Sequence, residues 1–184
     1  MLAGRLLLRL ALSAAVFRLD RDDVRSPDPA NPGFFVKTGQ QRTDGVELGV
    51  QGEITPAWLV FGGYSHLDGR ITQTMSAAAP GARLQLVPEH LFSLWNRVAL
   101  RPNWAFGVGL VYQSSSFATL DNQVEMPAFT RADGGVYDTF AGGRTRLALN
   151  VENVFDRKYW PTADGNNISP GAPRTLRLTL SSTF

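Results

Sequence analysis

The chain has 184 residues, of which 43% are hydrophobic and 18% charged, and its formal net charge is +2. It contains no cysteine, which excludes disulfides and thiolate metal sites. Its cations are nearly all arginines and form no run of five or more, so the sequence predicts no nucleic-acid-binding surface. The length fits one domain or one part of a larger protein.

The first predicted element is a strand at about 6–20, where leucines alternate with small or polar residues. The same N-terminus resembles a signal peptide, because Arg5 precedes an apolar stretch that ends in small residues. Arg9 interrupts that stretch, and a charge is unfavourable in the apolar region of a signal. We therefore favour the strand and keep a signal peptide and a helix as alternatives.

The charged run that follows, "RLDRDDVRSPD" at 18–28, allows two interpretations. Its four aspartates could bind a cation or form a polar recognition loop. We favour a solvated strand end in which these aspartates pair with neighbouring arginines.

Further alternating segments are separated by stretches rich in glycine, proline and asparagine, which predict turns. These segments predict seven more strands, at 35–54, 57–72, 89–101, 103–117, 129–141, 144–154 and from about 175 to the end. No apolar run reaches the length of about 18 residues that a membrane-spanning helix needs. The predicted connections alternate between short ones, at 55–57, 101–103 and 142–143, and long ones, at 26–33, 73–88, 118–128 and 156–172.

Alternating short and long connections are typical of outer-membrane β-barrels, which also carry aromatic girdles at both membrane interfaces. The aromatic residues that we expect near strand ends are Trp58, Trp95, Trp104, Tyr112, Tyr137, Tyr159 and Trp160. The sequence therefore predicts an all-β fold, an antiparallel transmembrane β-barrel segment of about eight strands, although a soluble sandwich has similar strand spacing. Trp58, Trp104, Tyr112 and the terminal Phe184 are our candidate membrane-interface aromatics, and polar Arg146, Asn150 and Glu152 are expected to face the aqueous interior.

The only histidines are His66 and His90, and they do not indicate a catalytic site. No G-x-S-x-G elbow is present, so a Ser-His-Asp set has no support. His66, Asp68 and His90 could bind a metal by residue type, but their spacing matches no known ligand run. The sequence predicts no enzyme, no catalytic residue, no metal site and no cofactor.

Four segments resemble TonB-dependent outer-membrane receptors for ferric siderophores. The first, 39–72, contains V-E-L, then G-E-I-T-P and Trp58, and the second is "PEHLFSLWNRVAL" at 88–100. The third, "LALNVENVFDRKYW" at 147–160, is similar to the penultimate strand of such receptors. The fourth, "GAPRTLRLTLSSTF" at 171–184, is similar to their closing strand.

This resemblance implies that residues 1–184 are the C-terminal portion of a 22-stranded barrel, without the N-terminal plug domain. The first and last strands would then pair with strands outside this chain, so we expect a curled open sheet. The intact receptor would take up ferric siderophores through the outer membrane of a Gram-negative bacterium, using the TonB complex. This portion alone is not expected to transport.

The same resemblance implies two further partners, the outer-membrane lipid and the barrel-assembly machinery, which would engage the C-terminal strand. Iron would arrive within its chelator, so no protein ligands for it are expected. Tyr159 and Trp160, in the loop at 156–167, are candidate siderophore contacts, with an interface girdle as the alternative. Two other functions stay open: a self-contained eight-stranded barrel with a structural or adhesive role, and a soluble ligand-binding barrel such as a lipocalin.

Overall fold

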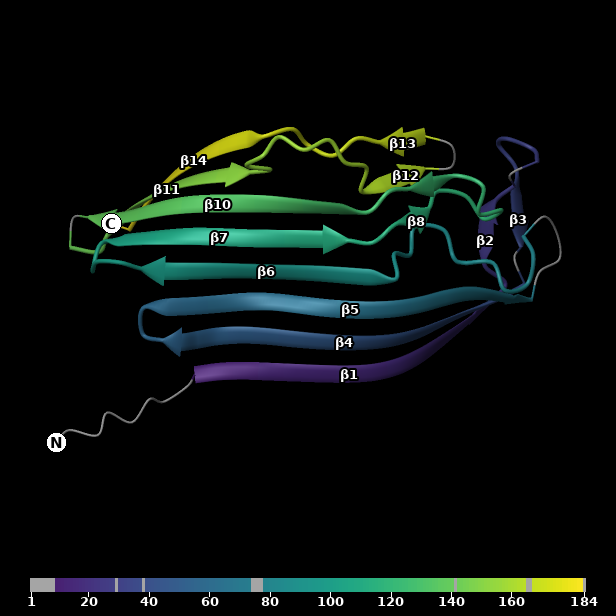
Figure 1. Ribbon diagram of the computed structural model, residues 1–184, viewed down its shortest axis with the longest axis horizontal. Helices are drawn as coiled ribbons and strands as arrows, with labels where there is room; N and C mark the ends of the chain where they lie inside the picture. Colours follow the sequence, from purple (N-terminus) through teal and green to yellow (C-terminus); the bar gives the residue numbers. More distant parts are fainter. Residues whose placement is uncertain are drawn as a thin grey trace.

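The chain folds into one large antiparallel sheet with three small two-stranded sheets at one end (Figure 1). The computed structural model describes residues 9–28, 30–37, 39–73, 78–140, 142–164 and 167–183. These residues include no helix, so the all-β prediction is confirmed for this part of the chain. A helix of the length and apolarity needed to cross a membrane is accordingly absent from the described residues.

The large sheet contains eight strands, each hydrogen-bonded to the next in chain order. They are β1 (Arg9–Asp22), β4 (Gln40–Thr55), β5 (Trp58–Gln73), β6 (His90–Ala99), β7 (Trp104–Gln113), β10 (Phe129–Phe140), β11 (Thr145–Glu152) and β14 (Thr175–Ser182). The small sheets pair β2 (Arg25–Pro27) with β3 (Phe35–Lys37), β8 (Ser116–Phe117) with β9 (Glu125–Met126), and β12 (Thr162–Asp164) with β13 (Asn167–Ser169).

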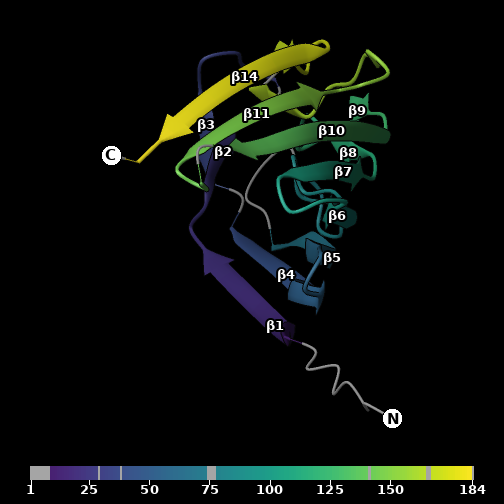
Figure 2. The same cartoon turned by 90° about the vertical axis from the view of Figure 1, so that its left-hand side faces the viewer.

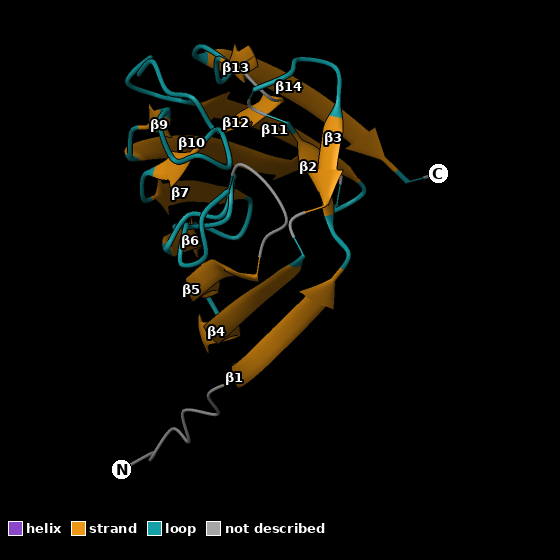
Figure 3. Cartoon of the chain, turned by 90° about the vertical axis from the view of Figure 1, so that its right-hand side faces the viewer, coloured by secondary structure: helices purple, strands orange, loops and turns teal. Residues whose placement is uncertain are grey.

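The connections alternate in length, as the sequence predicts. Tight turns join β4 to β5, β6 to β7 and β10 to β11, all at the left end in Figure 1. The four long connections leave from the opposite end, where three of them carry the small sheets, and Figure 3 views that end directly. One end of the sheet is therefore a rim of tight turns, and the other is a crown of loops.

The sheet is curled but open. β1 and β14 lie at its two edges, and the described residues of these strands do not pair with each other (Figure 2). The predicted open sheet is thus confirmed, and the eight strands do not form the closed barrel that a self-contained structural or adhesive protein would need.

Several predicted strands differ in their bounds. The segment 35–54 was expected to be continuous, but β3 and β4 are separated at Gly39, whose φ of 76° is unfavourable for a strand. The backbone N–H of Asp23 donates to the carbonyl of Gly39, 2.8 Å away, so this bend is held by the end of β1. The strand expected at 103–117 ends at Gln113, because residues 116–117 pair with β9 instead of β10.

The strand expected at 6–20 starts at Arg9 in the structure and extends to Asp22, while its residues 6–8 lie outside the described part of the chain. The last strand, β14, ends at Ser182.

The two faces of the sheet differ in size and exposure of their side chains. Along β7, Phe106, Val108 and Leu110 are exposed, whereas Ala105, Gly107 and Gly109 alternate with them and are buried. Side chains crowd on the concave side of a curled sheet, so the buried set marks the inner face and the exposed set the outer face. Residues that pair directly across strands lie on the same face. Leu94 and Ala132, which pair with Leu110, therefore also belong to the outer face.

Trp95 and Tyr137 belong to the inner face. The expectation of a position near a strand end was wrong for Trp95 but not for Tyr137, which lies three residues before the end of β10. Trp95 is in the middle of β6, and its ring covers Gly107 and Gly109 of the neighbouring strand. Tyr137 is buried with Ala105 and Ala148, against Trp95 and Ala99. Sequence alternation could not distinguish these rings from girdle aromatics, because the space for Trp95 depends on two glycines of the neighbouring strand and that for Tyr137 on Ala105 and Ala148 of its neighbours.

A Cβ atom on Gly109 would overlap the ring of Trp95, so Gly109→Ala should lower the free energy of unfolding by about 1–3 kcal/mol. Urea unfolding of the chain in detergent micelles measures this change. Gly63→Ala is the matched control, because its Cβ would have only an ordinary contact, 3.4 Å from the Leu48 carbonyl oxygen. Equal losses in both variants would contradict the packing of Trp95 on Gly109.

Candidate functional site

The inner face carries a cluster of arginines around Tyr137, near the rim of tight turns. Arg97 of β6 and Arg146 of β11 place their guanidinium carbons 5.4 and 4.9 Å from the centroid of the Tyr137 ring. The Tyr137 hydroxyl donates to Oδ1 of Asn150, 3.0 Å away. Antiparallel pairing of β10 with β11 and β6 with β7 brings these residues to one face. We call Arg97, Tyr137, Arg146 and Asn150 the arginine cluster.

A second polar group on the inner face lies nearer the loop crown. Arg131 Nη2 is 2.9 Å from a carboxylate oxygen of Asp133, and Nη1 donates to the Tyr159 hydroxyl at 3.1 Å. Asp133 also accepts the backbone N–H of Asn153 at 2.8 Å. A cavity of about 300 Å³ lies beside this group, lined by residues that include Trp95, Arg131, Asp133, Asn150, Glu152 and Arg177.

The charges of the inner face are only partly balanced. Arg131 is paired with Asp133, and Arg177 Nη2 lies 3.6 Å from a carboxylate oxygen of Glu152. Among the ion pairs of the described residues, none joins Arg97 or Arg146 to a carboxylate, and Nε of Arg97 is buried without a hydrogen-bond partner. The arginine cluster can therefore attract an anionic group, since guanidinium binds carboxylate, catecholate or phosphate oxygens well.

Tyr159 and Trp160, the candidate siderophore contacts, lie in different surroundings. Tyr159 is only 6% exposed, with its ring centroid 4.6 Å from that of Phe129 and its hydroxyl bound to Arg131. Gly171 lies directly against the Tyr159 ring and leaves no room for a side chain. Trp160 is 38% exposed, and of the two it is the more accessible to a ligand. The sequence analysis did not identify Arg97 or Arg131 as site residues. A signal for Arg131 was available, because an arginine two residues before an aspartate lies on the same face of a strand, as Arg131 and Asp133 do.

Asn153 organises the loop that carries Tyr159 and Trp160. It is 1% exposed and has a φ of 54°, a conformation that asparagine adopts more readily than most residues. Its side-chain Nδ2 donates to the carbonyls of Arg157 and Ala172, and its Oδ1 accepts the N–H of Arg157. One buried amide thus ties both ends of the β11–β14 connection to the sheet.

Asn153→Ala should lower the free energy of unfolding by about 2–4 kcal/mol, because it removes three hydrogen bonds made by a buried side chain. Asn167→Ala, at an exposed position of β13, should change it by less than about 0.5 kcal/mol. Urea unfolding in detergent micelles compares the two. Similar effects at both positions would contradict the role of Asn153 as the anchor of this loop.

The outer face has aromatic residues at both ends of its apolar band. Trp58 and Trp104 begin β5 and β7 at the rim of tight turns, and Trp58 Nε1 donates to Asn96 Oδ1 at 3.0 Å. Tyr112 lies near the other end of β7, in one cross-strand row with Phe92 and Tyr64. Eight residues separate Trp104 from Tyr112, about 26 Å along the strand and close to the apolar band of about 25 Å in such barrels. Phe184 lies outside the described residues.

The band between these rows is apolar and open to the surroundings. Leu12 and Val16 of β1 are 77% and 83% exposed, and Leu176 and Leu178 of β14 are 69% and 68% exposed. A shallow groove of about 490 Å³ on this face is lined largely by apolar groups, including Leu12, Leu48, Val50, Tyr64, Phe92 and Leu94. So large an exposed apolar surface is typical of a face that contacts a membrane or another protein rather than water.

Beyond the Tyr64 row, the outer face changes to charged residues. Arg18 binds Asp44 through two contacts of 2.6 and 3.0 Å, Arg42 binds Asp20 at 2.7 Å, and Arg70 binds Asp68 at 2.7 Å. These six residues form two neighbouring cross-strand rows, one of Arg18, Asp44 and Asp68 and the next of Asp20, Arg42 and Arg70. On each strand, the residue in one row therefore has the opposite charge to the residue in the other row. The expected pairing within the run at 18–28 was therefore wrong for the described residues: Arg18 and Asp20 pair with residues of β4, and Asp23 pairs with Lys37 of β3.

In the loop crown, local hydrogen bonds stabilise the negative charge of Asp28. The Asn31 side-chain amide and the Ala30 backbone N–H both donate to the Asp28 carboxylate. These bonds favour the ionised form and hold the pKa of Asp28 below its ordinary value.

The charged rows should make the stability of the chain depend on salt. Arg18→Asp places two aspartates opposite each other, so the urea midpoint in 50 mM NaCl should fall, and adding Asp44→Arg should restore it. In 1 M NaCl, where the Debye length is about 3 Å, the loss should shrink markedly. A loss of equal size at both salt concentrations would contradict an electrostatic cause.

Comparison with known proteins agrees with this geometry. Residues 4–154 match the family model described as "TonB dependent receptor-like, beta-barrel". The chain belongs to this family. It is 36% identical over 184 residues to the catecholate siderophore receptor Fiu of Escherichia coli K12, covering 96% of this chain and 24% of Fiu. It is 32% identical over 183 residues to the metal-pseudopaline receptor CntO of Pseudomonas aeruginosa UCBPP-PA14, covering 96% of this chain and 25% of CntO.

Solved structures show the same arrangement of strands. The siderophore receptor PiuA from Acinetobacter baumannii superposes with a TM-score of 0.82 at 26% identity, over 94% of this chain and 26% of PiuA. Fiu in its closed form gives a TM-score of 0.79 at 31% identity, over 97% of this chain and 26% of Fiu. The chain thus spans about a quarter of the length of the relatives that it matches, and it corresponds to a stretch of barrel wall in receptors for siderophores.

Proposed function

We propose that this chain forms the C-terminal part of the barrel wall of a ferric-siderophore receptor in the outer membrane of a Gram-negative bacterium. The receptor would bind its chelate on the side of the loop crown and move it inward with energy delivered by the TonB complex. It would act as a receptor and transporter rather than as an enzyme. Outer-membrane lipid would cover the outer face, and the barrel-assembly machinery would engage the last strand.

The observation that carries the proposal is the opposite character of the two faces of one curled sheet. The outer face exposes leucines and valines between rows of aromatic residues, which fits lipid. The inner face carries Arg97 and Arg146 without carboxylate partners, which fits an interior that meets anionic groups. Ferric catecholates and carboxylate-bearing chelates are anionic, and so are acidic side chains of a plug domain.

The open edges also support a place within a larger barrel. An unpaired edge strand leaves a row of backbone N–H and C=O groups without partners, which is very unfavourable in a bilayer. β1 would pair with a preceding strand and β14 with the first strand of the complete barrel. Trp58, Trp104, Tyr112 and Phe184 would then lie at the membrane interfaces, and Trp160, with Tyr159 behind it, would face the ligand.

A chimaeric receptor tests the proposal. Residues 9–184 would replace the matching stretch of Fiu in an Escherichia coli strain without its own catecholate receptors. We expect the chimaera to reach the outer membrane, to show heat-modifiable migration, and to restore uptake of radioactive iron from a ferric catecholate. Outer-membrane insertion and heat-modifiable migration without any uptake would contradict the siderophore part, and absence from the outer membrane would contradict the barrel part.

The same chimaera tests the arginine cluster. Changing both Arg97 and Arg146 to Gln should reduce uptake at least tenfold, because the interior loses two cations that have no carboxylate partner. Arg18→Gln, on the outer face, is the matched control and should leave uptake within about twofold. Equal uptake by the double variant and the control would remove the arginine cluster from the proposed mechanism.

A further inference from the structure

The two histidines of the chain, far apart in sequence, lie face to face on the outer face of the sheet. His66 of β5 and His90 of β6 are direct partners in the antiparallel register. Their ring centroids are 4.9 Å apart with an interplanar angle of 29°. Directly opposed cross-strand residues have Cβ atoms about 5 Å apart, which lets two imidazoles reach one ion.

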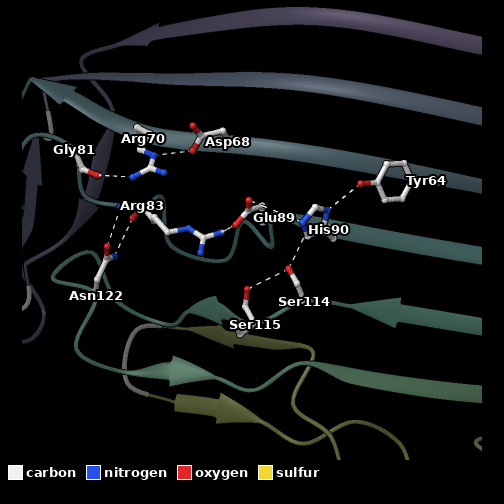
Figure 4. Close-up of polar contacts among 10 residues, drawn as sticks. All are labelled: Tyr64, Asp68, Arg70, Gly81, Arg83, Glu89, His90, Ser114, Ser115 and Asn122. Atoms are coloured by element: carbon white, nitrogen blue, oxygen red, sulfur yellow. Dashed lines mark hydrogen bonds and ion pairs between the residues drawn. The ribbon is translucent and has the colours of Figure 1, made fainter.

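Glu89 completes a set of three potential ligands. His66, Glu89 and His90 each offer one ligand atom, and these atoms lie within 4.8 Å of one another. Glu89 Oε2 is held by Arg83 Nη2 at 3.1 Å, and Oε1 is turned toward His90 Nε2 at 4.0 Å (Figure 4). The carboxylate is thus oriented by a cation on one oxygen, while the other oxygen faces the histidine.

The surrounding hydrogen bonds orient His90. Its Nδ1 lies 2.9 Å from the Tyr64 hydroxyl (Figure 4), and when Nδ1–H donates to Tyr64, the lone pair is on Nε2 and faces Glu89. Metal-binding histidines typically have such a partner on the second nitrogen. The backbone of His90 is fixed to Ser114, since its N–H donates to Ser114 Oγ at 3.0 Å and its carbonyl accepts the Ser114 N–H at 2.9 Å.

His66 has a polar atom without a hydrogen-bond partner at the same place. Its Nδ1 is buried and has no hydrogen-bond partner, which is unusual for a buried nitrogen in a folded protein. Asp68, the third residue that the sequence suggested beside the histidines, is bound to Arg70 at 2.7 Å, and Glu89 takes its place in the cluster.

The loop before β6 is held in position independently of the histidines. Asn122 accepts the N–H of Arg83 at 2.8 Å and donates to its carbonyl at 2.9 Å (Figure 4). The residue that orients Glu89 is therefore anchored on the neighbouring long connection.

We propose that His66, Glu89 and His90 bind one divalent transition-metal ion of the Zn²⁺ type at the crown end of the outer face. Two imidazoles and a carboxylate suit Zn²⁺ and related first-row ions, whereas Mg²⁺ and Ca²⁺ prefer oxygen ligands alone. Bond lengths of about 2.0–2.2 Å require the three ligand atoms to move together by roughly an ångström. The ion would bridge β5, β6 and the loop before β6, on the face opposite the arginine cluster, and would be distinct from any iron carried through the interior.

Titration of ZnCl₂ into the full chain folded in detergent micelles tests this site. We expect one Zn²⁺ per chain, with His66→Ala and His90→Ala each weakening binding at least tenfold. Tyr64→Phe keeps all three ligands but removes the hydrogen bond to His90, and it should weaken binding about tenfold. Zn²⁺ should also raise the unfolding temperature of the unsubstituted chain, and this rise should be lost in His90→Ala.

Asp68→Asn is the matched control, because Asp68 is a nearby carboxylate outside the cluster. It should leave the Zn²⁺ affinity within about twofold. Unchanged affinity in the His66→Ala/His90→Ala double variant would overturn the site and indicate adventitious binding by surface carboxylates. Absence of Zn²⁺ binding to the folded unsubstituted chain would overturn it as well.

Discussion

The hydrogen bonding of each strand to its neighbours is the constraint on which the rest of this structure depends. If lipid covers the outer face, as we propose, backbone N–H and C=O groups have no water to bind there and must pair within the sheet. Each strand of the large sheet pairs with the next in chain order, which leaves the open sides of β1 and β14 as the edges. The chain spans 24% of Fiu, and in the receptor that we propose, further barrel strands would pair with both edges.

The same pairing decides where chemistry is located. Because side chains alternate between faces, one register separates the leucines of β14 from Arg177 and sets Arg97, Tyr137 and Arg146 on the inner face. A shift of one residue would exchange the faces and bring charge onto the apolar outer face. The polar inner face and the apolar outer face therefore both result from the same register between the strands.

Local features then refine the positions that the register sets. Glycines on β7 admit the ring of Trp95, which could not lie flat over residues with side chains. Asn153 holds the last long connection, and Asn122 holds the loop before β6. Side-chain amides thus hold these two parts of the loop crown in position relative to the strands, at the end from which we propose that the ligand approaches.

The sequence by itself determined the alternation of strands, the alternation of short and long connections, and the family, because period-two patterning and turn residues are local signals. Only the tertiary structure decided which side chains meet. It turned Trp95 and Tyr137 inward and brought His66 to His90. It also paired Arg18 and Asp20 of the run at 18–28 with residues of β4. These contacts depend on register between strands many residues apart, and register is fixed by the summed pairing of whole strands rather than by any short motif.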